Sequence, residues 1–123
     1  MRRAAEKGDA NAQFGLAARY AWGQGVPQDY AQAVFWSRKA AEQGHADAQY
    51  NLGSMYGRGQ GVPQEYVEAH KWRNLAAARA SAKNQKEYAE TRDALAKLMT
   101  PQQIAEAQKR ASDWLAAFEA KPK

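Results

Sequence analysis

Two glycine-rich segments contain the residue types that could cradle a phosphate group. Their glycines are Gly23 and Gly25 in the first segment and Gly57, Gly59 and Gly61 in the second, and they could turn several backbone amides toward an anion. Neither segment is followed by the Gly-Lys-Ser/Thr sequence of a P-loop, and in both a Val-Pro pair follows the last glycine. We therefore predict turns here and not phosphate sites.

The titratable residues offer no catalytic or metal-binding arrangement. His45 and His70 are the only histidines, and neither has a second histidine four residues away or a nearby set of carboxylates. Glu65 and Glu68 are better explained as acidic residues at the positive end of a helix dipole. The absence of cysteine removes disulfides, thiolate metal sites and a cysteine nucleophile. We predict no catalytic residue, no metal, no cofactor and no enzymatic activity.

Composition favours helices and a protein partner. Ala, Gln, Glu, Lys and Arg dominate the 123 residues, whereas β-branched residues are few. The net charge of +5 raises the question of nucleic acid, but the cations are spread along the chain and interleaved with Glu, Asp and Gln, as on a solvated helix face. No apolar run approaches the roughly 20 residues of a membrane span. A nucleic-acid partner and membrane insertion are both disfavoured.

The glycine-rich segments and the titratable residues belong to an internal repeat. The chain aligns with itself after a shift of 36 residues (residue 44 minus residue 8), without a gap. The segment Gly-Gln-Gly-Val-Pro-Gln occurs at 23–28 and again at 59–64, and Leu16 and Tyr20 recur as Leu52 and Tyr56. A period between about 20 and 50 residues is typical of solenoid proteins, in which each unit stacks on the next.

Each unit is predicted to be a helix, a glycine-rich loop and a second helix. Asp9 can cap a first helix that ends at Gly23 and carries Ala12, Leu16 and Tyr20 on one face. Asp29 opens the second helix, which Gly44 closes. The same pattern predicts helices over 47–57 and 65–80 in the second unit. The inward stripe of the second helix is predicted to be Tyr30, Ala33, Trp36 and Ala40.

Two further helices are predicted after the repeats. The first runs over about 81–99 with Tyr88, Leu95, Leu98 and Met99 facing inward. The second begins at Thr100, Pro101 and Gln103, which form a helix-start signature of N-cap, proline at the first position and glutamine at the third. It is predicted to reach Phe118, with Ile104, Ala107, Ala111, Trp114 and Phe118 facing inward.

The predicted fold is therefore all-α, an α/α-solenoid of two helical hairpins with two C-terminal capping helices. We interpret residues 1–123 as one repeat domain. Residues 1–8 would be the end of a preceding helix, 9–44 the first repeat, 45–80 the second repeat, 81–119 the capping helices and 120–123 a tail.

Residues 4–80 resemble the Sel1-like repeat family in their glycines, proline, aromatics and period. The matched pattern is A-x-x-G-x-x-x-A-Q-x-x-L-G-x-x-Y-x-x-G-x-G-V-x-x-D-Y-x-x-A-x-x-W-x-x-K-A-A, from which Ala17 and Glu65 depart mildly. The resemblance implies an α/α-solenoid related to tetratricopeptide repeats and the work of a scaffold or adaptor. It also favours a periplasmic or secreted bacterial protein, although the chain shows no signal peptide, because the basic residues at its start precede no apolar stretch.

A candidate binding surface emerges from positions that differ between the two repeats, because packing does not dictate them. On the first helices, the face opposite the core residues mixes aromatic, amide and arginine side chains, which is typical of interface hot spots. Helical repeats usually present these helices along the concave side. This first-helix stripe consists of Asn11, Phe14, Ala18, Trp22, Asp47, Tyr50, Ser54 and Arg58.

The stripe predicts a module that binds a protein or peptide partner. An alternative for Phe14 and Tyr50 is that they only pack between neighbouring helices. An alternative function is self-association into a homo-oligomer through the N-terminal face around Ala5, Phe14 and Leu16.

Overall fold

The computed structural model describes residues 2–121, and within them all regular structure is α-helical. Met1 and the last two residues of the predicted tail lie outside the described residues. The helices are α1 (Arg2–Glu6), α2 (Ala10–Trp22), α3 (Tyr30–Glu42), α4 (Ala46–Arg58), α5 (Tyr66–Arg79), α6 (Ala82–Ala96) and α7 (Pro101–Ala120).

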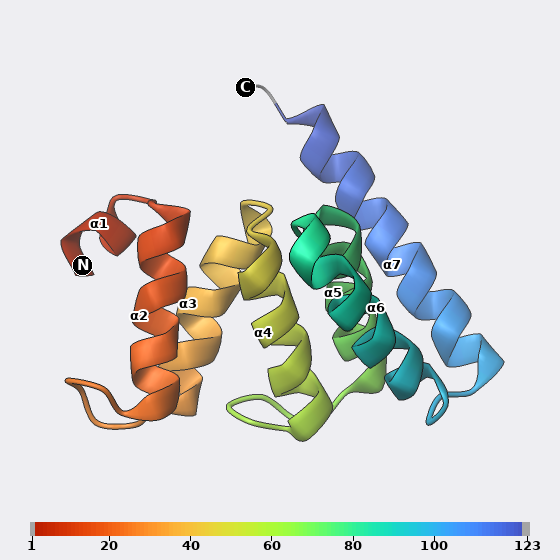
Figure 1. The fold of residues 1–123 in the computed structure, drawn as a ribbon, viewed down its shortest axis with the longest axis horizontal. Coiled ribbons are helices and arrows are strands. Elements are labelled where there is room, and N and C mark those ends of the chain that lie inside the picture. Colours follow the sequence, from red (N-terminus) through yellow and green to blue (C-terminus); the bar gives the residue numbers. More distant parts are fainter. Residues whose placement is uncertain (1, 122–123) are drawn as a thin grey trace.

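The helices stack as a solenoid of hairpins (Figure 1). α2 pairs with α3 and α4 pairs with α5, while α3 also packs on α4 and α5 on α6. We call α2, α4 and α6 the first helices and α3 and α5 the second helices. The long helix α7 lies along α5 at the end of the stack. This arrangement confirms the predicted all-α solenoid of two hairpins with two C-terminal helices.

Small residues and two tryptophans form the core between the layers. Ala33 and Ala69 are fully buried and occupy equivalent positions on α3 and α5, where they let the helices approach closely. Trp36 and Trp72, also equivalent, are 5% and 0% exposed. These positions of the packing surface therefore recur from one unit to the next.

Side-chain hydrogen bonds repeat with the same period. The amide of Gln13 donates to the Ala5 carbonyl at 3.0 Å, and the equivalent Gln49 donates to Ala41 at 3.2 Å. Gln28 likewise donates to the Ala21 carbonyl, a bond that recurs one unit later. The Gln13 and Gln49 bonds satisfy buried carbonyls, whereas the bond of Gln28 and its counterpart lie at the exposed ends of α2 and α4.

The predicted bounds of α4 were wrong at both ends. His45 caps the helix, since its Nδ1 accepts a hydrogen bond from the Ala48 amide at 3.1 Å, so the helix starts at Ala46. Gly57 lies inside the helix, which ends at Arg58 with Gly59 as the C-cap. A histidine ring nitrogen can accept this hydrogen bond in place of a carboxylate oxygen, so α4 begins one residue before the predicted start at Asp47.

Two residues predicted to face inward are exposed. Tyr30 is 37% exposed because it is the first residue of α3, at the edge of the core. Leu98 is 66% exposed because α6 ends at Ala96, so helical spacing no longer governs where its side chain points. The N-terminal signature of α7 is confirmed, with a full capping box between Thr100 and Gln103.

The loops provide a matched test of how tightly the units stack. Gly25 and Gly61 are equivalent and have nearly the same φ, +76° and +77°. A Cβ at Gly61 would overlap the Tyr30 carbonyl oxygen, whereas at Gly25 its nearest neighbour is Arg19 Nη1 at 3.7 Å. The second loop therefore packs closely against the first unit.

We expect Gly25→Ala to lower the free energy of unfolding by about 1–2 kcal/mol, the cost of a left-handed alanine. Gly61→Ala should cost about 1–3 kcal/mol more, because it adds a backbone clash. Urea unfolding monitored by circular dichroism measures both values. Equal losses for the two variants would contradict close stacking of the second loop.

Candidate functional site

The first-helix stripe separates into residues that pack between helices and residues that face solvent. Phe14 is half-buried and stacks on His45, with ring centroids 4.8 Å apart. Asn11 Oδ1 lies 2.9 Å from His45 Nε2. These contacts tie α2 to the start of α4, as the packing alternative for Phe14 predicted. Ala18, also half-buried, lies further along the same helix.

Tyr50 and Asp47 hold α6 against α4. The ring of Tyr50 stacks on that of Tyr88, with the ring centroids 4.1 Å apart and an interplanar angle of 9°. The Tyr88 hydroxyl donates to Asp47 Oδ1 at 2.6 Å. Burial, followed by this hydrogen bond, raises the pKa of Tyr88. Both stripe residues therefore have a structural role at the contact with the capping helix.

The remaining stripe residues converge at the C-terminal ends of α2 and α4. Trp22 is the last residue of α2 and is 76% exposed, and Arg58 is the last residue of α4. With Ser54 they line a pocket of about 170 Å³, which we call the first-helix pocket. Its other lining residues are Ala21, Gln28, Tyr30, Asn51, Met55 and Gln60.

Local structure fixes the walls of this pocket. The Gln28 amide donates to the Ala21 carbonyl at 2.9 Å and lies 3.3 Å from the Tyr30 hydroxyl, which it holds at the rim. Arg58 makes no ion pair with any described residue, so its charge is free to meet a ligand. Tyr30 was missed as a site residue because its recurrence in both repeats assigned it to the core.

A second pocket, of about 250 Å³, lies between α4, α5 and α6 and shares Arg58. Leu95, Leu98 and Arg73 also line it. Burial lowers the pKa of Arg73, and the nearby charge of Arg58 contributes less. Arg73 Nη1 donates to the Thr91 carbonyl at 3.2 Å. This pocket could not be predicted from the sequence, because Leu98 was expected to be buried.

The residues considered above for a metal site or for self-association are buried or lack the partners that such a site needs. Burial lowers the pKa of His70, which is 4% exposed. Within residues 2–121, no group of three or more His, Cys, Asp and Glu side chains could hold a metal ion. Ala5 and Leu16, proposed above for self-association, are buried with Trp36 in one cluster, and each is less than 5% exposed. Self-association through the N-terminal face stays a prediction, but Ala5 and Leu16 are too buried to be its contact residues.

A family model described as Sel1 repeat matches residues 10–45 and 46–81. The chain belongs to the Sel1 repeat family. Proteins with Sel1 repeats are generally scaffolds for protein interactions, and in bacteria they are often extracellular or periplasmic. A comparison with curated protein sequences gives no match. No helix in residues 2–121 combines the length and apolarity that crossing a membrane would need.

Two solved structures place the chain among Sel1-like proteins. One is c5321, a protective antigen present in uropathogenic Escherichia coli strains with an SLR fold, at 34% identity and a TM-score of 0.85. It is similar over 99% of this chain but 27% of its own length. The other, a Sel1 repeat protein from Oxalobacter formigenes, has 41% identity and a TM-score of 0.62 over 65% of this chain and 33% of its own. The chain thus spans about a third or less of either relative.

The two groups of stripe residues should respond differently to truncation. Tyr50→Ala removes a stacked ring at the α6 contact and should lower the free energy of unfolding by about 2–3 kcal/mol. Trp22→Ala removes an exposed side chain and should change it by no more than about 0.5 kcal/mol. Urea unfolding of both variants measures the difference, and a large loss for Trp22→Ala would mean that Trp22 packs in the native state.

Proposed function

We propose that this Sel1 repeat chain binds a peptide segment of a partner protein in the first-helix pocket. The observation that carries the proposal is Trp22, a large aromatic side chain that is 76% exposed at the mouth of the pocket. Arg58 and Ser54 stand beside it. Tryptophan and arginine are the residue types most enriched in interface hot spots.

The walls of the pocket favour a particular kind of segment. Trp22, Tyr30 and Met55 offer apolar surface for one aliphatic or aromatic side chain. Arg58, which has no acidic partner within the described residues, favours a carboxylate next to that side chain. We therefore propose a short segment that combines an apolar anchor with an acidic neighbour, in place of a small-molecule substrate or a cofactor.

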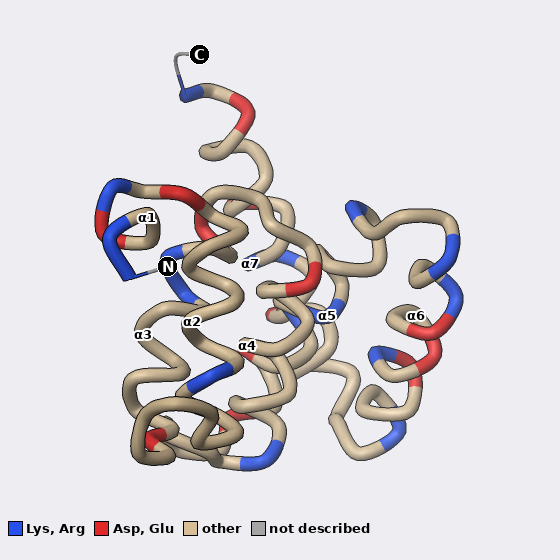
Figure 2. The backbone as a smooth tube through the Cα atoms, turned by 60° about the vertical axis from the view of Figure 1, so that its left-hand side comes forward, with Lys and Arg blue, Asp and Glu red and all other residues tan. Residues whose placement is uncertain are grey.

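The distribution of charge supports a protein partner over nucleic acid. Lys and Arg are interspersed with Asp and Glu along α6, and the cations elsewhere are scattered along the chain (Figure 2). Several of them are already paired, such as Lys109 with Asp113 at 2.9 Å. A phosphate-tracking protein would place unpaired cations in one stripe. We also propose that the module has no catalytic activity and acts in the periplasm or after secretion, as its family resemblance favours.

Selection of peptides from a displayed random library tests the site. Peptides selected on the full chain should carry an aromatic or aliphatic residue beside Asp or Glu. Trp22→Ala and Arg58→Glu should each raise their Kd by about tenfold or more, measured by fluorescence anisotropy. Arg19→Glu is the matched control, since this exposed arginine also lies in the last turn of its helix but not in the pocket.

Selected peptides that bind the wild type and both pocket variants equally would rule out this site. Circular dichroism of each variant verifies that the helices are retained. Equal weakening by Arg58→Glu and Arg19→Glu would indicate attraction by net charge and not recognition in the pocket.

A further inference from the structure

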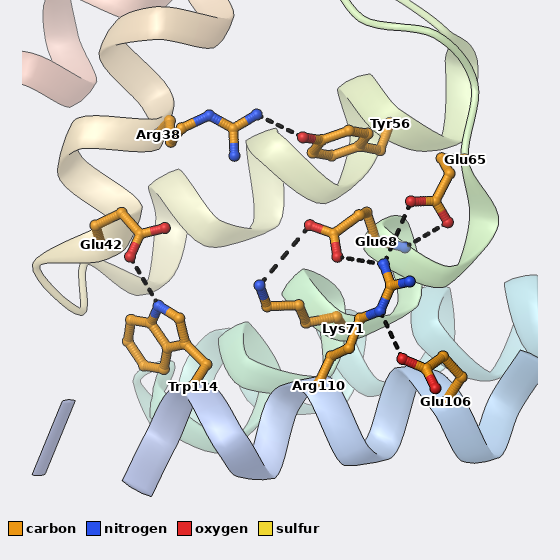
Figure 3. A network of polar contacts seen from close by, with 9 residues as sticks. All are labelled: Arg38, Glu42, Tyr56, Glu65, Glu68, Lys71, Glu106, Arg110 and Trp114. Carbon is orange, nitrogen blue, oxygen red and sulfur yellow. Dashed lines mark hydrogen bonds and ion pairs between the residues drawn. The ribbon is translucent and has the colours of Figure 1, made fainter. Parts of the chain in front are cut away.

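The chain itself shows how a helix docks between successive second helices. α7 lies along α5 and reaches the end of α3 (Figure 3). The rings of Trp114 and Trp72 pack edge to face with their centroids 5.7 Å apart. The Trp114 indole N–H donates to Glu42 Oε2 at 3.0 Å. Arg110 of the same helix donates to Glu68 at 2.9 Å. The buried Ala107 and Ala111 bring α7 close to the core, and Trp114 and Arg110 add an aromatic and two polar contacts.

The equivalent groove one unit earlier lies open. The residues equivalent to Trp72, Glu42 and Glu68, 36 positions earlier in the chain, are Trp36, Glu6 and Gln32. These three residues line a groove of about 730 Å³ between α1 and α3, which we call the α1–α3 groove. Phe35, on its rim, is 49% exposed.

The two grooves share the same supports. Arg38 donates to the Tyr56 hydroxyl beside the covered groove, and the equivalent Arg2 donates to Tyr20 beside the open one. Gln13, whose amide holds the Ala5 carbonyl, lines the open groove, and its counterpart Gln49 holds Ala41. The seat for a helix is therefore built in both units, although α7 fills only one.

We infer that the α1–α3 groove docks an acidic amphipathic helix of a partner protein. A tryptophan of this helix would pack beside Phe35, since Trp36 itself is only 5% exposed, and would donate its indole N–H to Glu6, as Trp114 does to Glu42. The helix-in-groove mode buries one apolar face and leaves the rim to set specificity.

The charge of the groove defines which helix fits. Its charged lining residues are Arg2, Glu6, Lys7 and Lys39, and only Arg2 and Glu6 pair with each other, at 3.3 Å. Two lysines are left without ion pairs among the described residues. Carboxylates on the docking helix would complement them.

A second copy of α7 is a poor occupant of this groove. Arg110 is held by Glu68 and Glu65, whose counterparts are Gln32 and Asp29, so one of its two acidic partners is lost. Leu115 packs on the core cluster that contains Leu75, whose counterpart is Lys39. An apolar residue at that position would desolvate the lysine without compensation. The groove therefore favours a different, acidic helix over self-association.

Two synthetic helices test this inference on the full chain. The native probe is a fluorescein-labelled peptide of residues 100–120, which retains the capping box. The acidic probe carries Arg110→Gln and Leu115→Glu, the changes that match Gln32 and Lys39. We expect the acidic probe to bind about tenfold more tightly than the native probe in fluorescence anisotropy, and its Trp114→Ala form to lose binding by about tenfold or more.

A charge exchange locates the binding. Lys39→Glu should weaken the acidic probe by about tenfold, and a probe with Leu115→Lys should recover the loss on this variant. Phe35→Asp should weaken every probe, whereas Arg19→Glu, which makes the same change in charge as Lys39→Glu but lies outside the groove, should weaken none. If the groove variants weaken the probes but the Trp22 and Arg58 variants do not weaken the selected peptides, this inference holds and the proposed function fails. The opposite pattern supports the proposed function alone.

Three outcomes would overturn the inference. Equal affinity of the acidic probe for the wild type and Lys39→Glu would show that it binds elsewhere, including by displacing α7. Tighter binding of the native probe would favour a second copy of this chain as the occupant. No binding of either probe, with helicity verified by circular dichroism, would show that the groove does not accept a helix.

Discussion

The fold depends on covering the apolar face that each helical hairpin leaves open. Two helices bury only the strip along which they touch, so the outer surface of the pair must meet a neighbouring unit. Fully buried alanines, such as Ala33 and Ala69, bring the layers close, and Trp36 and Trp72 fill the space between them. In the second unit α6 covers one side and α7 the other. The residues available for binding are those that this covering leaves exposed.

Much of the fold could be predicted because the repeat supplies two independent copies of each signal. Glycine loops, helix caps and apolar spacing all recur after 36 residues, and the capping box at Thr100 needs no tertiary information. The predicted helix bounds and inward faces were wrong where another residue type took the place of the usual helix cap, or where the helix had already ended. His45 caps α4 in place of a carboxylate, and Leu98 follows the end of α6, where helical spacing no longer applies.

The candidate site was harder to predict, because spacing identifies a face but not what covers it. Phe14, Tyr50 and Trp22 share one predicted stripe, yet their surroundings differ. Phe14 meets His45 and Tyr50 meets Tyr88, partners from other helices, whereas Trp22 at the end of α2 meets solvent. The partner of Tyr50 lies in α6, outside the clear repeats, so no comparison of the two units could identify it.

The repeat separates the residues that build a groove from those that determine what it binds. Hydrogen bonds such as Gln13 to Ala5 and Gln49 to Ala41 recur, so successive units share one backbone arrangement. Other residues of the groove do not recur: Lys39 stands where the next unit has the buried Leu75. This difference alters the charge that a ligand meets. Two units with the same repeated hydrogen bonds can therefore present chemically different surfaces to a ligand.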